Sequence, residues 1–139
     1  MNKEDVMQFI NANPACFLAT VDEDRPRVRG MLMYRADNEG ILFHTGEAKD
    51  LYRQILKNPR AEVCFISPDN RIQVRVSGTA EIVEDMDLKR AIVNDRDFLR
   101  PIVAQTGYDS LKVIRLTGCT ATYWTFERNF LPKEYIDLT

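Results

Sequence analysis

Residues 72–84, IQVRVSGTAEIVE, alternate between apolar and polar side chains over a long stretch. Successive side chains of an extended backbone point to opposite faces, so Val74 and Val76 would share one face and Gln73 and Arg75 the other. A glycine inside such a segment indicates a bend or a bulge. The pattern therefore predicts one long β-strand that bends at Gly78.

Shorter apolar and β-branched segments repeat this character along the chain. With the long segment, they predict six strands, at 15–21, 27–36, 41–45, 61–67, 72–84 and 111–127. The turn sequences DEDRP, DNEG and PDN separate several of them, and strands joined by short turns pair antiparallel. Helical patterns occupy 3–12, 47–57 and 85–104. We expect a mostly β fold with peripheral helices, a six-stranded antiparallel barrel that is closed or partly closed.

A chain of 139 residues is the size of one domain, and we expect residues 1–139 to form a single unit. The net charge of −2 and the pI of about 5.5 argue against a basic field for nucleic acid. No apolar run approaches the roughly 20 residues of a membrane span. The N-terminal sequence MNKEDVMQFINANP contains acidic residues and lacks an apolar segment, so we expect no signal peptide and a cytoplasmic protein.

Three cysteines, Cys16, Cys64 and Cys119, lie far apart in strand-like surroundings. Their odd number and wide spacing are typical of reduced cytoplasmic thiols, and we interpret them as small buried hydrophobic residues. One histidine and scattered cysteines do not supply four ligands at the usual spacing, so we expect no metal site.

The segment FHTGEAKDLYRQILKNPRAEVCF, residues 43–65, leads from a strand into a helix predicted to begin near Glu47. The start of a helix offers unpaired N–H groups and a positive dipole end. Thr45 would add a hydroxyl donor, Gly46 would permit close backbone approach, and Lys49 would add a full positive charge. These features predict a phosphate cradle. The alternative is that Thr45 only caps the helix and Lys49 is a solvated surface residue.

The segment PRVRGML, residues 26–32, places Arg27 and Arg29 on one face of a strand, beside Met31 and Met33. This combination indicates an anion lying next to a flat apolar surface. The alternative is a sheet edge that carries charge against aggregation.

Gln73 projects from a strand that is otherwise strongly apolar. Its amide both donates and accepts hydrogen bonds, as needed to recognise a ring edge that carries C=O and N–H groups. The alternative is an ordinary surface glutamine. Together with the two segments above, it predicts a ligand with a phosphate at one end and a polar-edged flat ring at the other.

Three blocks in order, FLATVDEDRPRVRGM, ILFHTGEAKDLYRQILKNPRAEVCF and IQVRVSGTAEIV, resemble the pyridoxamine 5′-phosphate oxidase-like FMN-binding split-barrel superfamily. The resemblance covers most of residues 14–84 and is loose beyond about residue 100. It implies an FMN-binding split barrel. The FMN contacts that it implies are Arg29, Gly30, Met31, Leu32, Met33, His44, Thr45, Lys49, Gln73 and Trp124.

Within that set, the resemblance implies that Arg29 and Lys49 contact the phosphate and that Gln73 addresses the isoalloxazine edge. The family's arginine before the lysine is replaced by Ala48, and the connecting loop is shorter, which weakens one phosphate contact. The resemblance also implies a homodimer with two FMN sites across its interface. The aromatic residues Tyr123 and Trp124 of the last strand would either shield a flavin face in the partner subunit or be ordinary core or interface residues.

The C-terminal sequence FERNFLPKEYIDLT lacks the Arg-x-His substrate element of pyridoxamine-phosphate oxidases, which argues against vitamin B6 oxidation. His44, the only histidine, would either transfer protons beside the flavin or offer a hydrogen bond at a strand end, and we favour the second. We therefore expect an FMN-dependent oxidoreductase that acts on a small acceptor such as a quinone, a nitro compound or another flavin. The alternatives are a non-enzymatic flavin store, carrier or stress and redox sensor, and a split barrel that binds haem or deazaflavin F420.

Overall fold

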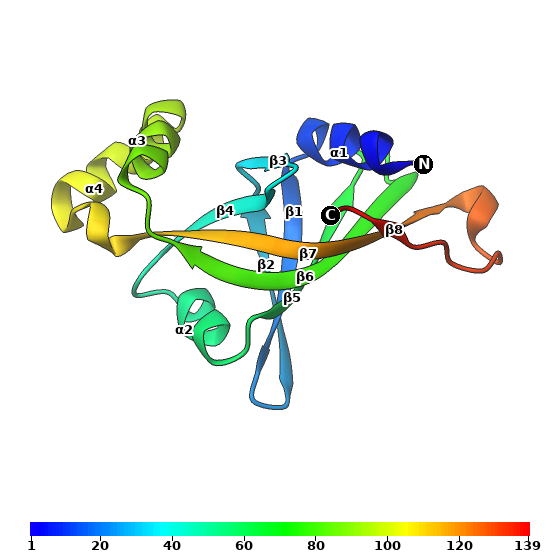
Figure 1. Cartoon of the computed structure of the whole chain (residues 1–139), viewed down its shortest axis with the longest axis horizontal. Coiled ribbons are helices and arrows are strands. Elements are labelled where there is room, and N and C mark those ends of the chain that lie inside the picture. The colour runs from blue at the N-terminus through cyan, green and yellow to red at the C-terminus, as the bar shows by residue number, and fades with distance from the viewer.

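The computed structural model describes residues 1–139 and contains one eight-stranded sheet in which every neighbouring pair is antiparallel (Figure 1). The strands are β1 (Ala15–Asp22), β2 (Arg25–Leu32), β3 (Arg35–Asp37), β4 (Gly40–Gly46), β5 (Arg60–Ile66), β6 (Ile72–Val83), β7 (Leu111–Thr125) and β8 (Ile136–Asp137). Their order is β2-β1-β5-β6-β7-β4-β3, and β8 pairs with β7. The mostly β antiparallel fold is confirmed, with eight strands instead of six, while closure of the sheet into a barrel stays a prediction.

The helices lie around this sheet, as expected. They are α1 (Lys3–Ala12), α2 (Asp50–Lys57), α3 (Met86–Asp95) and α4 (Arg100–Thr106), with short 3₁₀ turns at Asp97–Leu99, Tyr108–Ser110 and Phe126–Arg128. α3 and α4 stand together at one end of the molecule, and the segment between β7 and β8 projects at the other end (Figure 1). None of the helices has the length and apolar character needed to cross a membrane.

The long alternating segment forms β6, as predicted, and its pairing with β7 is irregular at Gly78. The register between β6 and β7 shifts between Ser77 and Thr79. A Cβ atom at Gly78 would lie 2.9 Å from the Cys119 Sγ atom and 3.0 Å from the Thr117 carbonyl oxygen. Glycine is therefore the residue that lets β7 approach β6 closely at the bulge.

The single strand predicted at 27–36 is wrong, because the chain changes partners at Met33 and Tyr34. β2 pairs with β1, whereas β3 pairs with β4. Between them, the Met33 N–H donates to the Pro14 carbonyl oxygen at 2.9 Å and the Tyr34 N–H donates to the Leu42 carbonyl oxygen at 2.8 Å. The strands at the two ends of the sheet order, β2 and β3, are therefore consecutive in the chain.

The helix predicted to begin near Glu47 begins three residues later, at Asp50, with Lys49 as its N-cap. Lys49 has an extended backbone, with φ −81° and ψ 149°, so the helical conformation begins only after it. The Glu47 N–H before it donates to the Ser110 carbonyl oxygen at 2.8 Å. Thr45 belongs to β4 and is buried. The alternative interpretation of Thr45 as the cap of this helix is therefore wrong.

The core consists of a large apolar cluster around Phe43 and Phe65, and a smaller one in which Ile92 of α3 packs with Leu42 and Val113. Cys16 and Cys119 are buried, as predicted, and Cys64 is partly buried. Burial raises the pKa of the Cys16 thiol to about 12 and that of the Cys119 thiol to about 11. All three thiols are free, and the two buried ones behave as apolar core residues.

Candidate functional site

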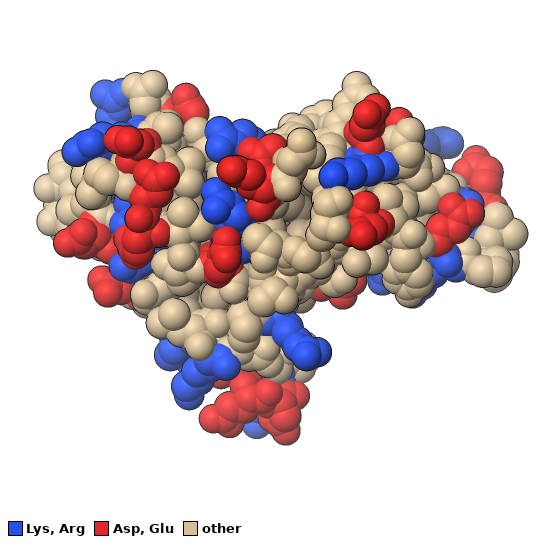
Figure 2. Space-filling view, viewed as in Figure 1, with Lys and Arg blue, Asp and Glu red and all other residues tan.

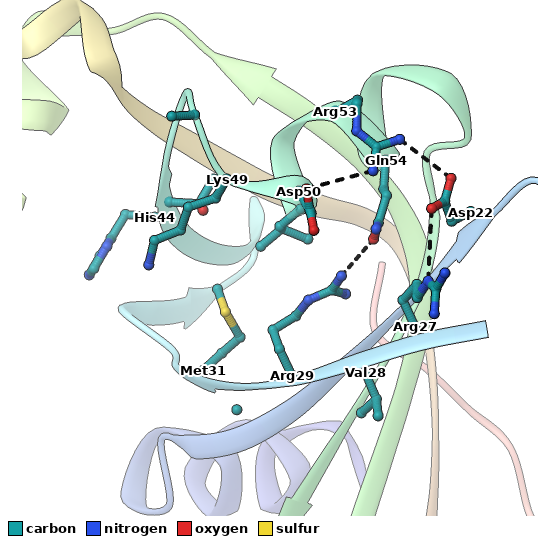
Figure 3. A pocket seen from close by; sticks show the side chains of 14 residues that line it. Asp22, Arg27, Val28, Arg29, Met31, His44, Lys49, Asp50, Arg53 and Gln54 are labelled. Atoms are coloured by element: carbon teal, nitrogen blue, oxygen red, sulfur yellow. Dashed lines mark hydrogen bonds and ion pairs between the residues drawn. The ribbon is translucent and has the colours of Figure 1, made fainter. Parts of the chain in front are cut away.

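β2, the end of β4 and the start of α2 enclose a cavity of about 810 Å³ (Figure 3). This volume lies within the range of about 300–1,000 Å³ that is typical of small-molecule sites. The lining residues are Asp22, Arg27, Val28, Arg29, Gly30, Met31, His44, Thr45, Ala48, Lys49, Asp50, Leu51, Arg53 and Gln54. The residues of the helix entrance and those of the PRVRGML segment, which are distant in sequence, therefore face the same space.

Arg29 lies at the back of the cavity, where two buried polar side chains hold its guanidinium group. Its Nη2 donates to the Gln54 Oε1 atom at 2.6 Å, and its Nη1 donates to the Thr20 Oγ1 atom at 2.8 Å and to the Leu18 carbonyl oxygen at 3.3 Å. The Thr20 hydroxyl also donates to the Gln54 Oε1 atom at 2.6 Å. Gln54 and Thr20 are 3% and 2% exposed, so the guanidinium group of Arg29 is held by buried side chains and not by surface contacts.

Lys49 stands at the opposite side of the cavity, at the start of α2 (Figure 3). Its side chain is exposed and forms no ion pair. No side chain caps α2, so the first N–H groups of the helix are unpaired beside this lysine. The positive end of the helix dipole and the ammonium group thus lie together at the start of α2, an arrangement that favours a bound anion there.

Charged side chains around the cavity give it a positive balance. Four cations (Arg27, Arg29, Lys49 and Arg53) face two carboxylates (Asp22 and Asp50), a local charge of +2 in a chain whose net charge is −2. Arg53 pairs with both carboxylates, at 3.4 Å to Asp22 and 3.7 Å to Asp50, while Arg27 lies 3.8 Å from Asp22. Lys and Arg side chains gather below α2, whereas acidic ones cover the tip of the β1–β2 hairpin (Figure 2).

His44 forms part of the wall near Lys49, and its ring is partly buried at the end of β4. Its Nε2 atom lies 2.7 Å from Nη1 of Arg96. Burial, followed by the positive charges of Arg96 and Lys49, lowers the pKa of His44 to about 4. The imidazole is therefore neutral at physiological pH.

Six of the ten predicted contact residues meet in this cavity: Arg29, Gly30, Met31, His44, Thr45 and Lys49. Leu32 lies at the exposed end of β2, and the side chain of Met33 is in the core. The Met33 N–H donates to the Pro14 carbonyl oxygen, and the Met33 carbonyl oxygen accepts from Arg96. Gln73 and Trp124 are direct cross-strand partners on β6 and β7 and do not line the cavity of their own chain.

Gln73 and Trp124 lie instead on the sheet face that carries the exposed apolar residues of β1 and β2. Cross-strand partners share a face, and one row runs from Gly30 through Phe17 and Cys64 to Arg75, two residues from Gln73 on β6. We call this the outer sheet face. Its exposed apolar residues are Phe17 (53% exposed), Val28 (69%) and Leu32 (43%). A Cβ atom at Gly30 would meet nothing within 4 Å, so this face is open beside the cavity.

Comparison with known proteins identifies the family. The family model described as pyridoxamine 5′-phosphate oxidase matches residues 3–118. The chain belongs to the pyridoxamine 5′-phosphate oxidase family. The matched range contains every cavity residue, and it ends before Trp124.

Curated relatives match a smaller part of the chain. A pyridoxine/pyridoxamine 5′-phosphate oxidase of Rhizobium johnstonii is 40% identical over 86 residues, which is 61% of this chain and 42% of that protein. The match therefore spans about two fifths of the relative's length.

Solved structures of the family share the fold over nearly the whole chain. A NimC/NimA family protein from Clostridium acetobutylicum has a TM-score of 0.76 at 18% identity, covering 96% of this chain and 90% of its own. A pyridoxamine 5′-phosphate oxidase-related, FMN binding protein from Nostoc punctiforme has a TM-score of 0.69 at 17% identity, covering 95% and 87%. At this identity, the likeness shows the fold, and the family to which the chain belongs is FMN-binding.

Sequence reasoning missed three residues that shape this family member's cavity: Thr20, Gln54 and Arg96. Gln54 could have been recognised from the sequence, because it follows Leu51 by three positions and therefore lies on the buried side of α2. A polar residue at such a position needs a buried partner. No sequence pattern indicated Arg96, since its contact with His44 joins residues 52 positions apart.

Proposed function

We propose that the cavity binds FMN, with the phosphate at the start of α2. The observation that carries this proposal is the unpaired ammonium group of Lys49 beside an uncapped helix terminus, opposite an arginine held in place by buried partners. A phosphate at that position would complete the hydrogen bonds of the first turn of α2 and would be attracted by the local charge of +2.

The flavin ring would then extend along the backbone from Gly30, in β2, toward Met33, just beyond the end of that strand. Three features support this placement: open space lies where a side chain of Gly30 would stand, Met31 lines the cavity, and His44 forms part of its wall. Arg29 has donors left after its contacts with Thr20, Gln54 and Leu18, because a guanidinium group carries five N–H groups.

We further propose that a second copy of the chain completes the site. Gln73 and Trp124 do not reach the cavity of their own protomer, yet they share the outer sheet face with Phe17, Val28 and Leu32. An exposed apolar face of this kind suits burial in a two-fold symmetric dimer. Packing two such faces together would carry Gln73 and Trp124 of one copy toward the cavity edge of the other.

The proposed activity is that of an FMN-dependent oxidoreductase acting on a small acceptor such as a quinone, a nitro compound or another flavin. FMN would supply the electron transfer when bound, while the protein binds and orients it and tunes its potential. Vitamin B6 oxidation is not proposed, since the C-terminal segment FERNFLPKEYIDLT lacks the Arg-x-His element and the match to the curated oxidases covers about two fifths of their length.

A non-enzymatic flavin store, carrier or sensor is the second candidate, because the same binding geometry serves it without a substrate pocket. Haem is disfavoured by a specific contact: the Nε2 atom of His44, the only histidine, is already engaged by Arg96. F420 also carries a phosphate and a ring, so this site chemistry does not distinguish it from FMN. Titration of the protein with each compound would do so.

The test is an absorbance spectrum of the purified protein before and after addition of FMN, followed by NADH or NADPH under anaerobic conditions. We expect oxidised-flavin bands that change on binding, and bleaching by a nicotinamide if the protein is an enzyme. Bound flavin without bleaching by either nicotinamide would favour the store or sensor. Absence of FMN binding at micromolar concentration would refute the central proposal, and F420 and haem titrations would follow.

A further inference from the structure

Arg96, at the C-terminal cap of α3, joins that helix to the cavity wall. Its Nη1 donates to the Leu32 carbonyl oxygen at 2.9 Å and its Nη2 donates to the Met33 carbonyl oxygen at 2.6 Å. The same Nη1 lies 2.7 Å from the Nε2 atom of His44. The guanidinium group thus connects the end of β2 to the histidine of β4.

The direction of the Arg96–His44 hydrogen bond follows from the chemistry of the two groups. A guanidinium group has only donors, so the Nε2 atom of His44 must accept and cannot carry a proton. The proton of the neutral ring is then on Nδ1. His44 lines the cavity, and its Nδ1 atom makes no hydrogen bond within the protein and is not among the fully buried polar atoms without a partner, so this atom keeps some exposure.

Neighbouring contacts hold Arg96 in this position. Its guanidinium carbon lies 5.4 Å from the centre of the Tyr34 ring, and the Tyr34 hydroxyl donates to the Asp95 Oδ2 atom at 2.6 Å. Phe98 covers His44 from the same segment, with ring centres 6.3 Å apart. The charged groups that act on the imidazole are Arg96 from α3 and Lys49 from α2, and both oppose its protonation.

We propose that Arg96 is a positioning residue that fixes His44 in its Nδ1-protonated tautomer, making the histidine a permanent hydrogen-bond donor to the cavity. The ligand atom beside His44 must then be an acceptor, such as a carbonyl oxygen or an unprotonated ring nitrogen. A role as proton carrier is disfavoured at this position, because the Nε2 atom is engaged by Arg96 and burial and the neighbouring charges lower the pKa of the ring. The assignment of that acceptor to the flavin edge or to a bound substrate rests on the proposed function; the tautomer does not.

The single histidine of the chain makes this testable without FMN. In protein labelled with ¹⁵N-histidine, we expect one set of imidazole signals at neutral pH, with Nδ1 pyrrole-like and Nε2 pyridine-like. The variant Arg96→Met, which has no donor, should move His44 toward the Nε2-protonated tautomer that free imidazole prefers, and should raise its pKa toward the usual value near 6.5.

Two further variants separate this role from general stability. Arg96→Lys keeps a cationic donor and should retain the Nδ1-protonated form. Tyr34→Phe removes the hydrogen bond to Asp95 but leaves the donor, so it should leave the tautomer unchanged. A wild-type spectrum with a proton on Nε2, or an Arg96→Met spectrum identical to that of the wild type, would overturn the proposal. Because these spectra are recorded without cofactor, a failure to bind FMN would leave their result intact.

Discussion

The Nη2 atom of Arg29 donates to the Oε1 atom of Gln54 at 2.6 Å, so a residue of the sheet edge is tied to the buried side of α2. The helix that offers its N-terminus to an anion and the arginine that faces it are therefore held at a fixed separation. Such preorganisation lowers the cost of ordering charged side chains when a ligand binds. The contact also links the stability of the fold to the quality of the proposed site.

Replacement of Gln54 with Met keeps the volume but removes the acceptor shared by Arg29 and Thr20. One buried hydroxyl and one guanidinium N–H would lose their partner, which costs about 1–3 kcal/mol. We expect the free energy of unfolding in urea to fall by about this amount and the affinity for FMN to fall as well. Gln8→Met, on the exposed side of α1, is the control and should change neither quantity. An unchanged affinity in Gln54→Met would show that Arg29 needs no support to serve the ligand.

The proposed phosphate contact at Lys49 is tested by Lys49→Ala. Loss of a charge-assisted hydrogen bond costs roughly 1.5–3 kcal/mol, so we expect the dissociation constant of FMN to rise about 10- to 150-fold. Lys57→Ala is a matched control, since it removes an exposed lysine from the other end of the same helix. Isothermal titration of both variants at one ionic strength measures the difference. Equal affinities for the two variants would remove Lys49 from the site.

Local chemistry explains why most strands and α1 could be predicted from the sequence. Alternation in residues 72–84 and the turn at DNEG depend on neighbours in the chain, and both appear in the structure. Arg29 and Lys49 each belong to a local pattern that the sequence shows, and both line the same cavity, while their contact with a ligand stays a prediction.

The predictions that failed depend on distant partners. The helix starts at Asp50 because Lys49 has an extended backbone, and the preceding Glu47 N–H donates to the Ser110 carbonyl oxygen, far along the chain. The strand of residues 27–36 divides because Tyr34 finds its partner on β4 and not on β1. No local pattern contains either contact, and the same holds for the placement of Arg96 on His44.

The depressed pKa of His44 predicts how stability changes with pH. The pKa is about 4 in the folded protein and near 6.5 in the unfolded chain. Between these values only the unfolded state binds the proton, so the free energy of unfolding falls as the pH is lowered, by at most about 1.4 kcal/mol per pH unit. Urea titrations at pH 7, 6 and 5 should show a steeper loss for the wild type than for His44→Asn. Parallel losses would indicate that carboxylates alone account for the pH dependence.

The outer sheet face is the proposed dimer interface, and Val28→Glu tests it. A carboxylate at this position, 69% exposed in the protomer, would be buried without a partner in a dimer, which is costly. We expect light scattering after size exclusion to report a dimer for the wild type and a monomer for Val28→Glu. Ile102→Glu places the same charge on α4, at a residue 52% exposed, and should leave the dimer intact. A wild type that is monomeric with FMN bound would refute the shared site.

A site built from two chains makes one further prediction, because Lys49 and Gln73 would then contact each FMN from different subunits. Gln73→Leu should shift the flavin reduction potential more than it weakens FMN binding, since it acts on the ring edge and not on the phosphate. Differently tagged Lys49→Ala and Gln73→Leu chains, coexpressed and purified through both tags, would form dimers with one doubly altered site and one site in which both residues are intact. At FMN concentrations that saturate only the wild type, we expect these dimers to bind about half the wild-type amount of FMN, and that flavin should have the wild-type potential. If Lys49 and Gln73 acted within one chain, every site of the mixed dimer would carry one substitution, and no flavin with both wild-type affinity and wild-type potential would be found.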